Sequence, residues 1–345
     1  MTRNLKALLV GGIGGGLFYA AGLPLAWMLG SMCFSTIAAL RGIDLTVNDS
    51  LRKFMTAILG VMLGSGFTPD TVNAIGRWSG GVVLLVLSII LSMSLVYIFY
   101  RKVGKFDPVT AYFSAAPGGL NVMYEVGEAK GGSGPTIALI HASRILILVM
   151  TVPMFFRYVV GVPGTAKMIP MFGSINELTG DGWLIVALII GYGAGYLCRL
   201  PAYHLMGPLL VTALFQIIGI TDVAPPMALV YLSQLVIGTA IGARFLGTKF
   251  RDIRHVIGLS IISTFIMVMI ATIFGLLFAD AIGVTVAGVI LALSPGGLAE
   301  MSLVALALGI DVAFVSIMHV IRISLIIAIV PIVHSSFQRM ITRRK

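Results

Sequence analysis

Two arginines stand inside long apolar runs of the sequence. Arg144 and Arg322 each follow a histidine, His141 or His319, by three residues, so each pair shares one face of a helix. At 1.5 Å per residue, both arginines lie near the middle of a bilayer, where a charge costs at least about 2.5 kcal/mol. Each must therefore face a partner, a cavity or a ligand. A guanidinium group offers a planar fork that suits a carboxylate, which predicts an anion-binding face.

A Pro-Gly-Gly motif precedes each arginine at the same distance. Pro117 lies 24 residues before His141, and Pro295 lies 24 residues before His319. Proline removes an amide donor and glycine permits sharp turns, so each motif breaks a helix and exposes backbone amides and carbonyls. Such breaks at membrane depth bind carboxylates and cations in secondary transporters. The predicted substrate-binding residues are Ser114, Pro117, Gly118, Gly119, Asn121, His141, Arg144, Ser294, Pro295, Gly296, Gly297, His319 and Arg322.

Each of these residues also has a purely structural interpretation. Arg144 and Arg322 would clamp the carbonyls that the broken segments leave free. The histidines would form hydrogen bonds between helices, which is commoner than a proton relay. The Pro-Gly-Gly motifs would be simple kinks. The anion site and the clamp are compatible alternatives, because a substrate can share the same donors.

Carboxylates are scarce near these motifs. Glu300 lies three residues after Gly297 and is the candidate for a coupling ion, H⁺ or Na⁺, or for pairing with an arginine. Val122 occupies the matching place in the first copy, so any such role is asymmetric. Glu125 and Glu128 fit better in a solvated loop.

The sequence does not favour an enzyme. A copper or di-iron site needs several histidine or carboxylate ligands together, and only His141 and His319 occupy comparable intramembrane positions. Cys33 and Cys198 lie in or beside apolar segments without a CxxC or CxxH pattern, which argues against a disulfide framework or structural zinc. We expect no catalytic residues, no metal site and no cofactor other than the coupling ion.

The composition predicts a membrane protein with several crossings. Apolar residues make up 58% of the chain and charged residues 10%, against about 25% charged residues in soluble domains. The mean hydropathy is +1.05. Apolar runs approach the ~20 residues that cross a bilayer as a helix. They are Leu5–Gly22, Ser79–Tyr100, Pro135–Val160, Trp183–Cys198, Val256–Phe278 and Val312–Val333.

The net charge of +10 comes from short basic clusters between the apolar runs. This pattern is typical of cytoplasmic loops under the positive-inside rule and does not indicate nucleic-acid binding. Met1–Gly22 imitates a signal peptide, but it has a counterpart later in the chain and is expected to be the first transmembrane helix.

The chain is a tandem duplication. Offsets of 177 or 178 residues carry Leu23-Pro24, Gly60-x3-Gly64 and the Pro-Gly-Gly and His-x-x-Arg motifs into the second half. The glycine spacings suit close helix packing in lipid. We predict repeat one at 1–160, a Gly- and Pro-rich linker at 161–182, and repeat two at 183–345. Each repeat contains six apolar segments, in the first about 5–22, 25–40, 54–67, 79–100, 107–123 and 135–160.

Basic residues follow different segments in the two halves. In half one, the loop after segment four contains Arg101, Lys102 and Lys105, whereas the loop after segment three, 68–78, is poor in basic residues. In half two, the basic residues 244–254 follow segment three. The halves therefore have opposite orientations, and each crosses an odd number of times. We predict five transmembrane helices per half plus a Pro-Gly-Gly re-entrant or broken helix. Both termini are then cytoplasmic and the linker lies on the opposite side.

The repeated Pro-Gly-Gly-Leu segments, the His-x-x-Arg pairs and the Leu-Pro-x5-Gly elements resemble the AbrB duplication family of bacterial membrane proteins. Members are often labelled regulators or "ammonia monooxygenase", and the similarly named DNA-binding regulator is unrelated. The resemblance covers essentially the whole chain and implies a bacterial inner-membrane location.

The architecture also resembles the glutamate–sodium and 2-hydroxycarboxylate symporters. That resemblance implies that Arg144 and Arg322 contact a substrate carboxylate. It places Gly118, Gly119, Gly296 and Gly297 at hairpin tips. Here the tip is Pro-Gly-Gly, where the citrate transporters have Gly-Gly-x-Gly, so the resemblance does not define the substrate.

The leading hypothesis is a secondary active transporter of a small organic anion that works by alternating access with H⁺ or Na⁺. Its partners are that anion, the lipid bilayer and, as one form of assembly, a second copy in a homodimer. The alternative is a membrane-embedded regulator of gene expression that acts through solute flux or sensing.

Overall fold

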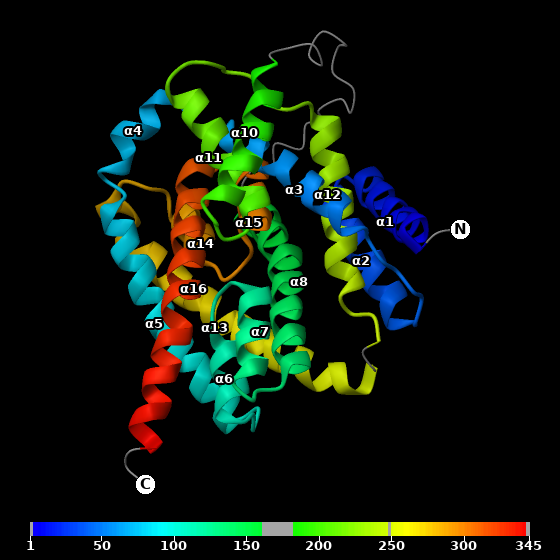
Figure 1. Ribbon diagram of the computed structural model, residues 1–345, viewed down its shortest axis with the longest axis vertical. Coiled ribbons are helices and arrows are strands. Elements are labelled where there is room, and N and C mark those ends of the chain that lie inside the picture. Colours follow the sequence, from blue (N-terminus) through cyan, green and yellow to red (C-terminus); the bar gives the residue numbers. More distant parts are fainter. Residues whose placement is uncertain (1–2, 161–181, 248–249, 343–345) are drawn as a thin grey trace. The chain divides into compact units, whose positions relative to one another are not determined.

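The computed structural model describes residues 3–160, 182–247 and 250–342, and within these ranges the regular structure is helical with no strand (Figure 1). Residues 161–181 of the predicted linker lie outside the described residues. The helices are α1 Arg3–Ala20, α2 Ala26–Leu40, α3 Asp49–Gly64, α4 Pro69–Ile75, α5 Ser79–Lys102, α6 Pro108–Ala115, α7 Leu120–Ala129, α8 Gly134–Tyr158, α10 Trp183–Leu197, α11 Tyr203–Ile217, α12 Met227–Ala243, α13 Phe250–Ile282, α14 Val286–Leu293, α15 Leu298–Ala307 and α16 Val312–Thr342.

Four helical stretches in the described ranges are long and apolar enough to cross a membrane. They are Ser79–Lys102, Gly134–Tyr158, Arg254–Ile282 and Val312–His334. Helices α2, α10, α11, α12 and α15 are also apolar but shorter. The prediction of an all-helical protein with several membrane helices is therefore confirmed at this level.

The duplication extends to the ends of the helices. A shift of 178 residues places both ends of α6 and α7 on those of α14 and α15, and a shift of 177 does the same for α2 and α11. The main departure from the predicted segments is α4, which lies in the expected loop at 68–78. Pro69 begins that helix, and the amide of Thr68 donates to Thr71 Oγ1 at 3.0 Å as part of a capping box.

The chain forms two compact units, and each unit draws on both repeats. Unit 1 comprises Met1–Trp78, Val149–Asp252 and Leu298–Ser316, and unit 2 comprises Ser79–Leu148, Ile253–Gly297 and Ile317–Lys345. The predicted boundaries at 1–160 and 183–345 describe the duplication in sequence, whereas the compact units combine matching pieces of both copies.

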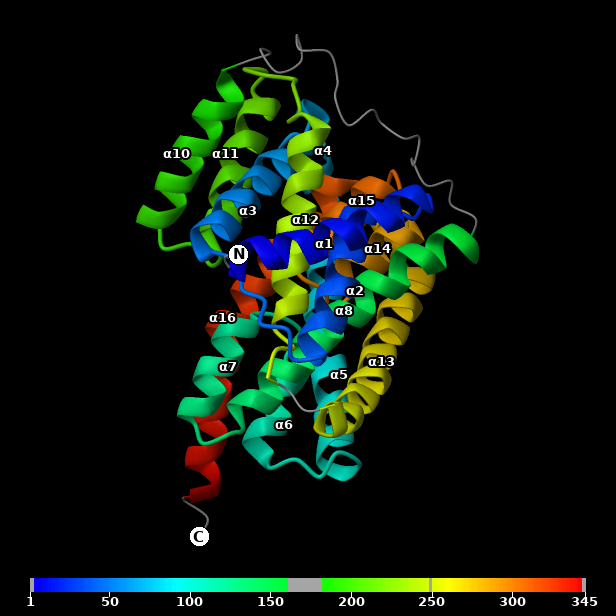
Figure 2. The same ribbon diagram turned by 90° about the vertical axis from the view of Figure 1, so that its right-hand side faces the viewer.

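Glycines bring helix backbones together in unit 1. A Cβ added to Gly30 of α2 would lie 2.1 Å from the carbonyl oxygen of Gly14 in α1. In the second copy, a Cβ added to Gly207 of α11 would lie 2.0 Å from the carbonyl oxygen of Gly191 in α10. Both pairs therefore require glycine. Figure 2 shows α10 and α11 side by side.

The third helix of each repeat packs on the second helix of the other repeat. A Cβ on Gly60 of α3 would lie 2.5 Å from the Leu205 carbonyl oxygen in α11, and one on Gly238 of α12 would lie 2.5 Å from that of Met28 in α2. Close glycine contacts of this kind are typical of membrane helices. The exchange between the two copies within unit 1 is therefore reciprocal.

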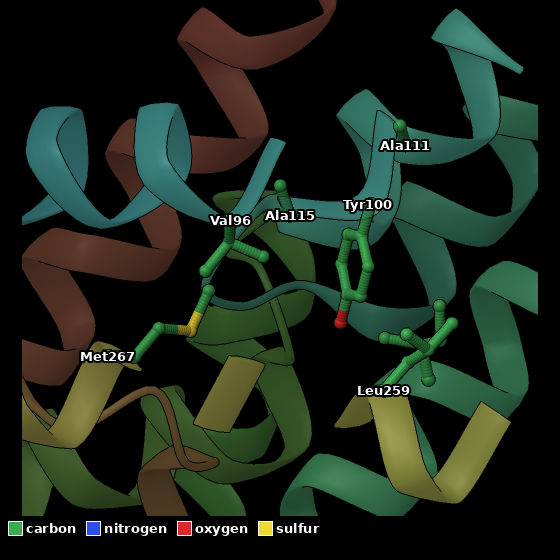
Figure 3. Packing of buried hydrophobic residues seen from close by; sticks show 7 residues of the cluster. Val96, Tyr100, Ala111, Ala115, Leu259 and Met267 are labelled. Carbon is green, nitrogen blue, oxygen red and sulfur yellow. The ribbon is translucent and has the colours of Figure 1, made fainter. Parts of the chain in front are cut away.

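The core of unit 2 surrounds the first broken segment. Tyr100 of α5, fully buried, donates a hydrogen bond to Ser263 Oγ of α13 at 2.7 Å. Figure 3 shows this tyrosine among its apolar neighbours. The buried cluster consists of Val96, Tyr100, Ala111, Ala115, Ile140, Leu259 and Met267. These contacts join α5, α6, α8 and α13 and fix the position of the turn that follows α6.

Candidate anion-binding site

The first Pro-Gly-Gly motif separates α6 from α7. The helix ends at Ala115, and the Gly118 amide donates to the Ala116 carbonyl at 3.0 Å, which closes a tight turn around Pro117. Gly118 and Gly119 have φ angles of 149° and 67°. These conformations are strained for residues with a Cβ, which explains the two glycines.

The chain returns to its starting end after this turn. The amide of Ser133, which follows α7, donates to Thr110 Oγ1 in the first turn of α6 at 2.7 Å. Asp107 caps α6 by accepting from the amides of Val109 and Thr110. Partial burial raises the pKa of the Asp107 carboxyl, but hydrogen bonds from Thr110 and Val109 outweigh it, so this pKa lies below its ordinary value. Segments α6 and α7 therefore form a capped hairpin whose ends meet.

The second motif repeats the same turn. Helix α14 ends at Leu293, the amide of Gly296 donates to the Ser294 carbonyl at 2.9 Å, and α15 begins at Leu298. Thr285 caps α14 by accepting from the Gly288 amide at 3.1 Å. The break between α14 and α15 therefore has the same turn as the break between α6 and α7.

Arg144 binds the carbonyls at the end of α6. Its Nη2 donates to the Ala116 carbonyl at 2.9 Å, and its Nη1 lies 3.5 Å from the Ser114 carbonyl. Nη2 also lies 2.9 Å from His141 Nδ1, and His141 Nε2 lies 3.0 Å from the Phe113 carbonyl. Because guanidinium groups only donate, Nδ1 accepts and Nε2 carries the proton, which describes a neutral imidazole. Both side chains are almost completely buried.

Arg322 holds the second turn in a related way. Its Nη1 donates to the Ser294 carbonyl and its Nη2 to the Gly296 carbonyl, and the side chain is fully buried. His319, one helical turn earlier, is also fully buried. The structural alternative for the arginines, a clamp on freed carbonyls, is therefore present in both copies.

The clamps leave positive charge uncompensated within unit 2. Among the described residues, neither Arg144 nor Arg322 forms an ion pair with a carboxylate, and the Nε atom of each lacks a hydrogen-bond partner there. Arg144 Nη2 donates to the Ala116 carbonyl beside the first turn. A Cβ added to Gly118 would lie 4.0 Å from Arg322 Nε, so the first turn adjoins the second arginine. These features describe a place where an anion would be stabilised.

The other predicted residues contribute unequally. Ser294 Oγ donates to the Ile290 carbonyl at 2.6 Å, whereas the buried Ser114 Oγ has no partner within the described ranges. Pro117 and Pro295 are buried at the turns. Gly119 and Gly297 are half-buried, and Asn121 lies in the first turn of α7.

The acidic candidates lie on helices. Glu300 occupies the first turn of α15 in unit 1, where it is half-buried and interacts electrostatically with Arg244 at the end of α12. Glu125 and Glu128 were expected in a loop, but they lie on the exposed face of α7 because the helix resumes directly after the turn. Tyr100 and its bond to Ser263 were not predicted, because neither residue recurs at the repeat offset, where Phe278 and Leu85 stand.

Comparison with known proteins identifies the family. The chain is 24% identical over 355 residues to "Uncharacterized protein YhjN" of Bacillus subtilis (strain 168), an alignment that covers 96% of this chain and 92% of that protein. It is 26% identical over 312 residues to "Putative regulator AbrB" of Escherichia coli (strain K12), covering 89% and 88%. The family described as "Transition state regulatory protein AbrB" matches residues 27–338. This match spans most of the chain, which therefore belongs to the AbrB family.

Proposed function

We propose that this protein is a secondary active transporter of a small organic anion of the carboxylate type. It works by alternating access and couples transport to H⁺ or Na⁺. The observation that carries this proposal is the pair of buried guanidinium groups in unit 2, Arg144 and Arg322, which both adjoin the first turn and have no carboxylate partner among the described residues. A bound carboxylate would neutralise part of this charge, which is costly inside a bilayer.

The clamps and an anion site are compatible on the same arginines. A guanidinium group has five N–H donors in a fixed fork. Arg322 uses two donors on the Ser294 and Gly296 carbonyls, and Arg144 uses its Nη groups on carbonyls and His141. The remaining donors, including both Nε–H groups, are available to a carboxylate. The clamps would hold the guanidinium planes in place, so that little ordering cost remains when the anion binds.

The proposed architecture has two oppositely oriented halves, each with five crossings and one re-entrant hairpin. The meeting ends of the α6–α7 hairpin support re-entry, since a crossing segment would separate them. The reciprocal packing of α3 on α11 and of α12 on α2 supports a two-fold relation between the repeats. The shifted basic clusters place that axis in the membrane plane. Glu300 is the proposed coupling-ion residue.

Transport can be tested in proteoliposomes with an imposed H⁺ or Na⁺ gradient. Radiolabelled dicarboxylates, hydroxy acids and amino acids would be screened for gradient-dependent uptake. We expect uptake of at least one anion by the unmodified protein, and its loss in Arg322→Ala protein that still elutes as a folded species. Arg41→Ala, at an exposed position, is the matched control and should transport normally. Normal uptake by the Arg322→Ala variant would refute the proposed site.

The orientation of the halves requires a separate experiment. Single cysteines at Ser174→Cys and at a C-terminal extension, in a background without Cys33 and Cys198, would be labelled with an impermeant maleimide in intact cells. Labelling of Ser174→Cys alone would agree with opposite halves. The same accessibility at both positions would mean parallel halves.

The second candidate function is regulation of gene expression, which rests on the printed names of the family and of the Escherichia coli relative. A transporter would change expression only through the solute that it moves. If a transport-dead Arg322→Ala variant restored the expression pattern of a deletion strain, the regulatory function would be favoured.

A further inference from the structure

An apolar groove of about 860 Å³ lies in unit 2, and neither Arg144 nor Arg322 lines it. It is formed by α5, α6 and α16, which Figure 1 draws in cyan, teal and red. Its wall is almost entirely aliphatic. The lining includes Ile90 and Tyr97 of α5, Tyr112 of α6, and His334 of α16.

The groove becomes polar at one end only. Tyr97 and Tyr112 are in edge-to-face contact, with ring centroids 6.4 Å apart, and Tyr112 lies 5.1 Å from the His334 ring. The Tyr112 hydroxyl donates to the Val330 carbonyl at 3.0 Å. Only 5% of the His334 surface is exposed, and its Nδ1 has no hydrogen-bond partner among the described residues.

Positive charge surrounds this polar end. Arg101 and Lys102 follow Tyr97 within about one turn of α5, and both are exposed. Lys130, after α7, is exposed, and a Cβ added to Gly132 beside it would lie 3.1 Å from Val109 Cγ1 in the groove wall. The candidate span of α5 ends at Lys102. The basic end of the groove therefore coincides with the end of this membrane helix.

The length of the groove matches one lipid leaflet. Its α5 wall runs from Val86 to Tyr97, about 16 Å along the helix axis. Half of a bilayer's hydrocarbon core is about 15 Å thick. An acyl chain would thus fill the aliphatic part while its head group reaches the tyrosines, the histidine and the basic residues.

We propose that this groove is a binding site for an anionic phospholipid. The acyl chains lie against α5 and α16, and the phosphate accepts hydrogen bonds at the Tyr97–His334 end beside Arg101, Lys102 and Lys130. Basic groups at a membrane surface attract anionic lipids, and the aliphatic wall holds the chains. The site is independent of the arginine clamps and of the proposed transport function.

Native mass spectrometry of the full-length protein in mild detergent tests this proposal. Delipidated protein would be titrated with phosphatidylglycerol and, separately, with phosphatidylcholine of the same chains. We expect one phosphatidylglycerol per chain to bind at least tenfold more tightly than phosphatidylcholine. Ile90→Trp, which fills the groove at an exposed position, should weaken this binding at least tenfold. Leu87→Trp is the matched control, since Leu87 is exposed on α5 but does not line the groove.

The charged end is tested by Lys102→Glu combined with Lys130→Glu, which should remove the preference for phosphatidylglycerol while phosphatidylcholine binding is unchanged. Equal affinity of the unmodified protein for both lipids would overturn the proposal, as would full binding by Ile90→Trp. If Ile90→Trp instead shifts the protein from dimer to monomer without loss of lipid, the groove is an interface between copies and the lipid assignment is wrong.

Discussion

In unit 1 the two copies of the repeat make the same contacts, whereas in unit 2 their arginines share one equivalent carbonyl, that of Ala116 or Ser294, and differ in the second. The Gly14–Gly30 approach is reproduced by Gly191–Gly207 with nearly the same distance. Such close backbone contacts leave no room for an added side-chain atom, so replacement of these glycines in either copy would lower stability. The two copies therefore keep the same residues at positions where close packing requires glycine.

The arginines follow another pattern. Arg144 reaches Ala116 and, at the limit of a hydrogen bond, Ser114, both before Pro117. Arg322 reaches the carbonyls on both sides of its proline, Ser294 and Gly296. One arginine therefore holds the end of a helix and the other holds the turn itself. The two clamps have therefore diverged in their second carbonyl.

The largest effect is expected from the glycines of unit 1. Gly30→Ala and Gly207→Ala each force a Cβ against a backbone oxygen that has no room to move. Each should therefore lower the free energy of unfolding by about 3 kcal/mol or more. Thermal unfolding of purified protein measures this. Gly16→Ala and Gly193→Ala, which have open space around the new Cβ, should stabilise their helices by about 0.5–1 kcal/mol. A difference between the two copies would contradict the symmetry.

The next largest effect separates the two clamps. Lysine keeps the charge but has no fork, so Arg322→Lys releases one of two buried carbonyls and should cost about 1.5–3 kcal/mol. Arg144→Lys should cost less, because its second carbonyl contact is already long at 3.5 Å. Unfolding midpoints of both variants in the same detergent provide the comparison. Equal losses would mean that the clamps are equivalent despite their different partners.

The repeat offset made most of the fold predictable. It places both ends of three helix pairs in register, α2 with α11, α6 with α14 and α7 with α15, and it singles out Gly60 and Gly238 as packing residues. It could not show that α3 packs on α11 and α12 on α2, because an offset relates residues in sequence and carries no information about which copy supplies the partner. The interleaved units follow from that exchange.

The site was predictable in its residues and less so in its bonds. Burial and isolation of Arg144 and Arg322 follow from charge inside an apolar run. Their carbonyl partners depend on the φ and ψ angles of the turns, which a Pro-Gly-Gly motif permits but does not determine. The Tyr100–Ser263 bond left no repeated signal at all. Helix α4 was not predicted because its seven residues show no apolar periodicity. The sequence marks it only by the capping box at Thr68.

A smaller effect is expected at the first turn. Gly119 has a φ of 67°, in the left-handed region, so Gly119→Ala should cost about 1–2 kcal/mol although the added Cβ would contact Ile327 only at 3.4 Å. The strain lies in the backbone, so a smaller neighbour at Ile327→Val should not restore stability. Rescue by Ile327→Val would show that crowding, and not the backbone conformation, requires glycine here.

The smallest effect on stability is expected at the residues that cap α6 and α14. Asp107 caps α6 and Thr285 caps α14 at equivalent positions, so Asp107→Ala and Thr285→Ala should each cost about 1 kcal/mol at pH 7. The pKa of Asp107 is lowered in the folded protein. Its contribution is therefore complete above its unfolded pKa of about 3.9 and is lost as the pH falls through the folded value.

The two caps should consequently respond differently to acid. Between pH 7 and pH 3 the stability difference between unmodified protein and Asp107→Ala should shrink, while that of Thr285→Ala stays constant because a hydroxyl does not titrate. Urea unfolding of the three proteins at both pH values measures the difference. A parallel response of the two variants would mean that the carboxylate charge adds nothing to the cap, and that α6 and α14 begin in the same way despite their different residues.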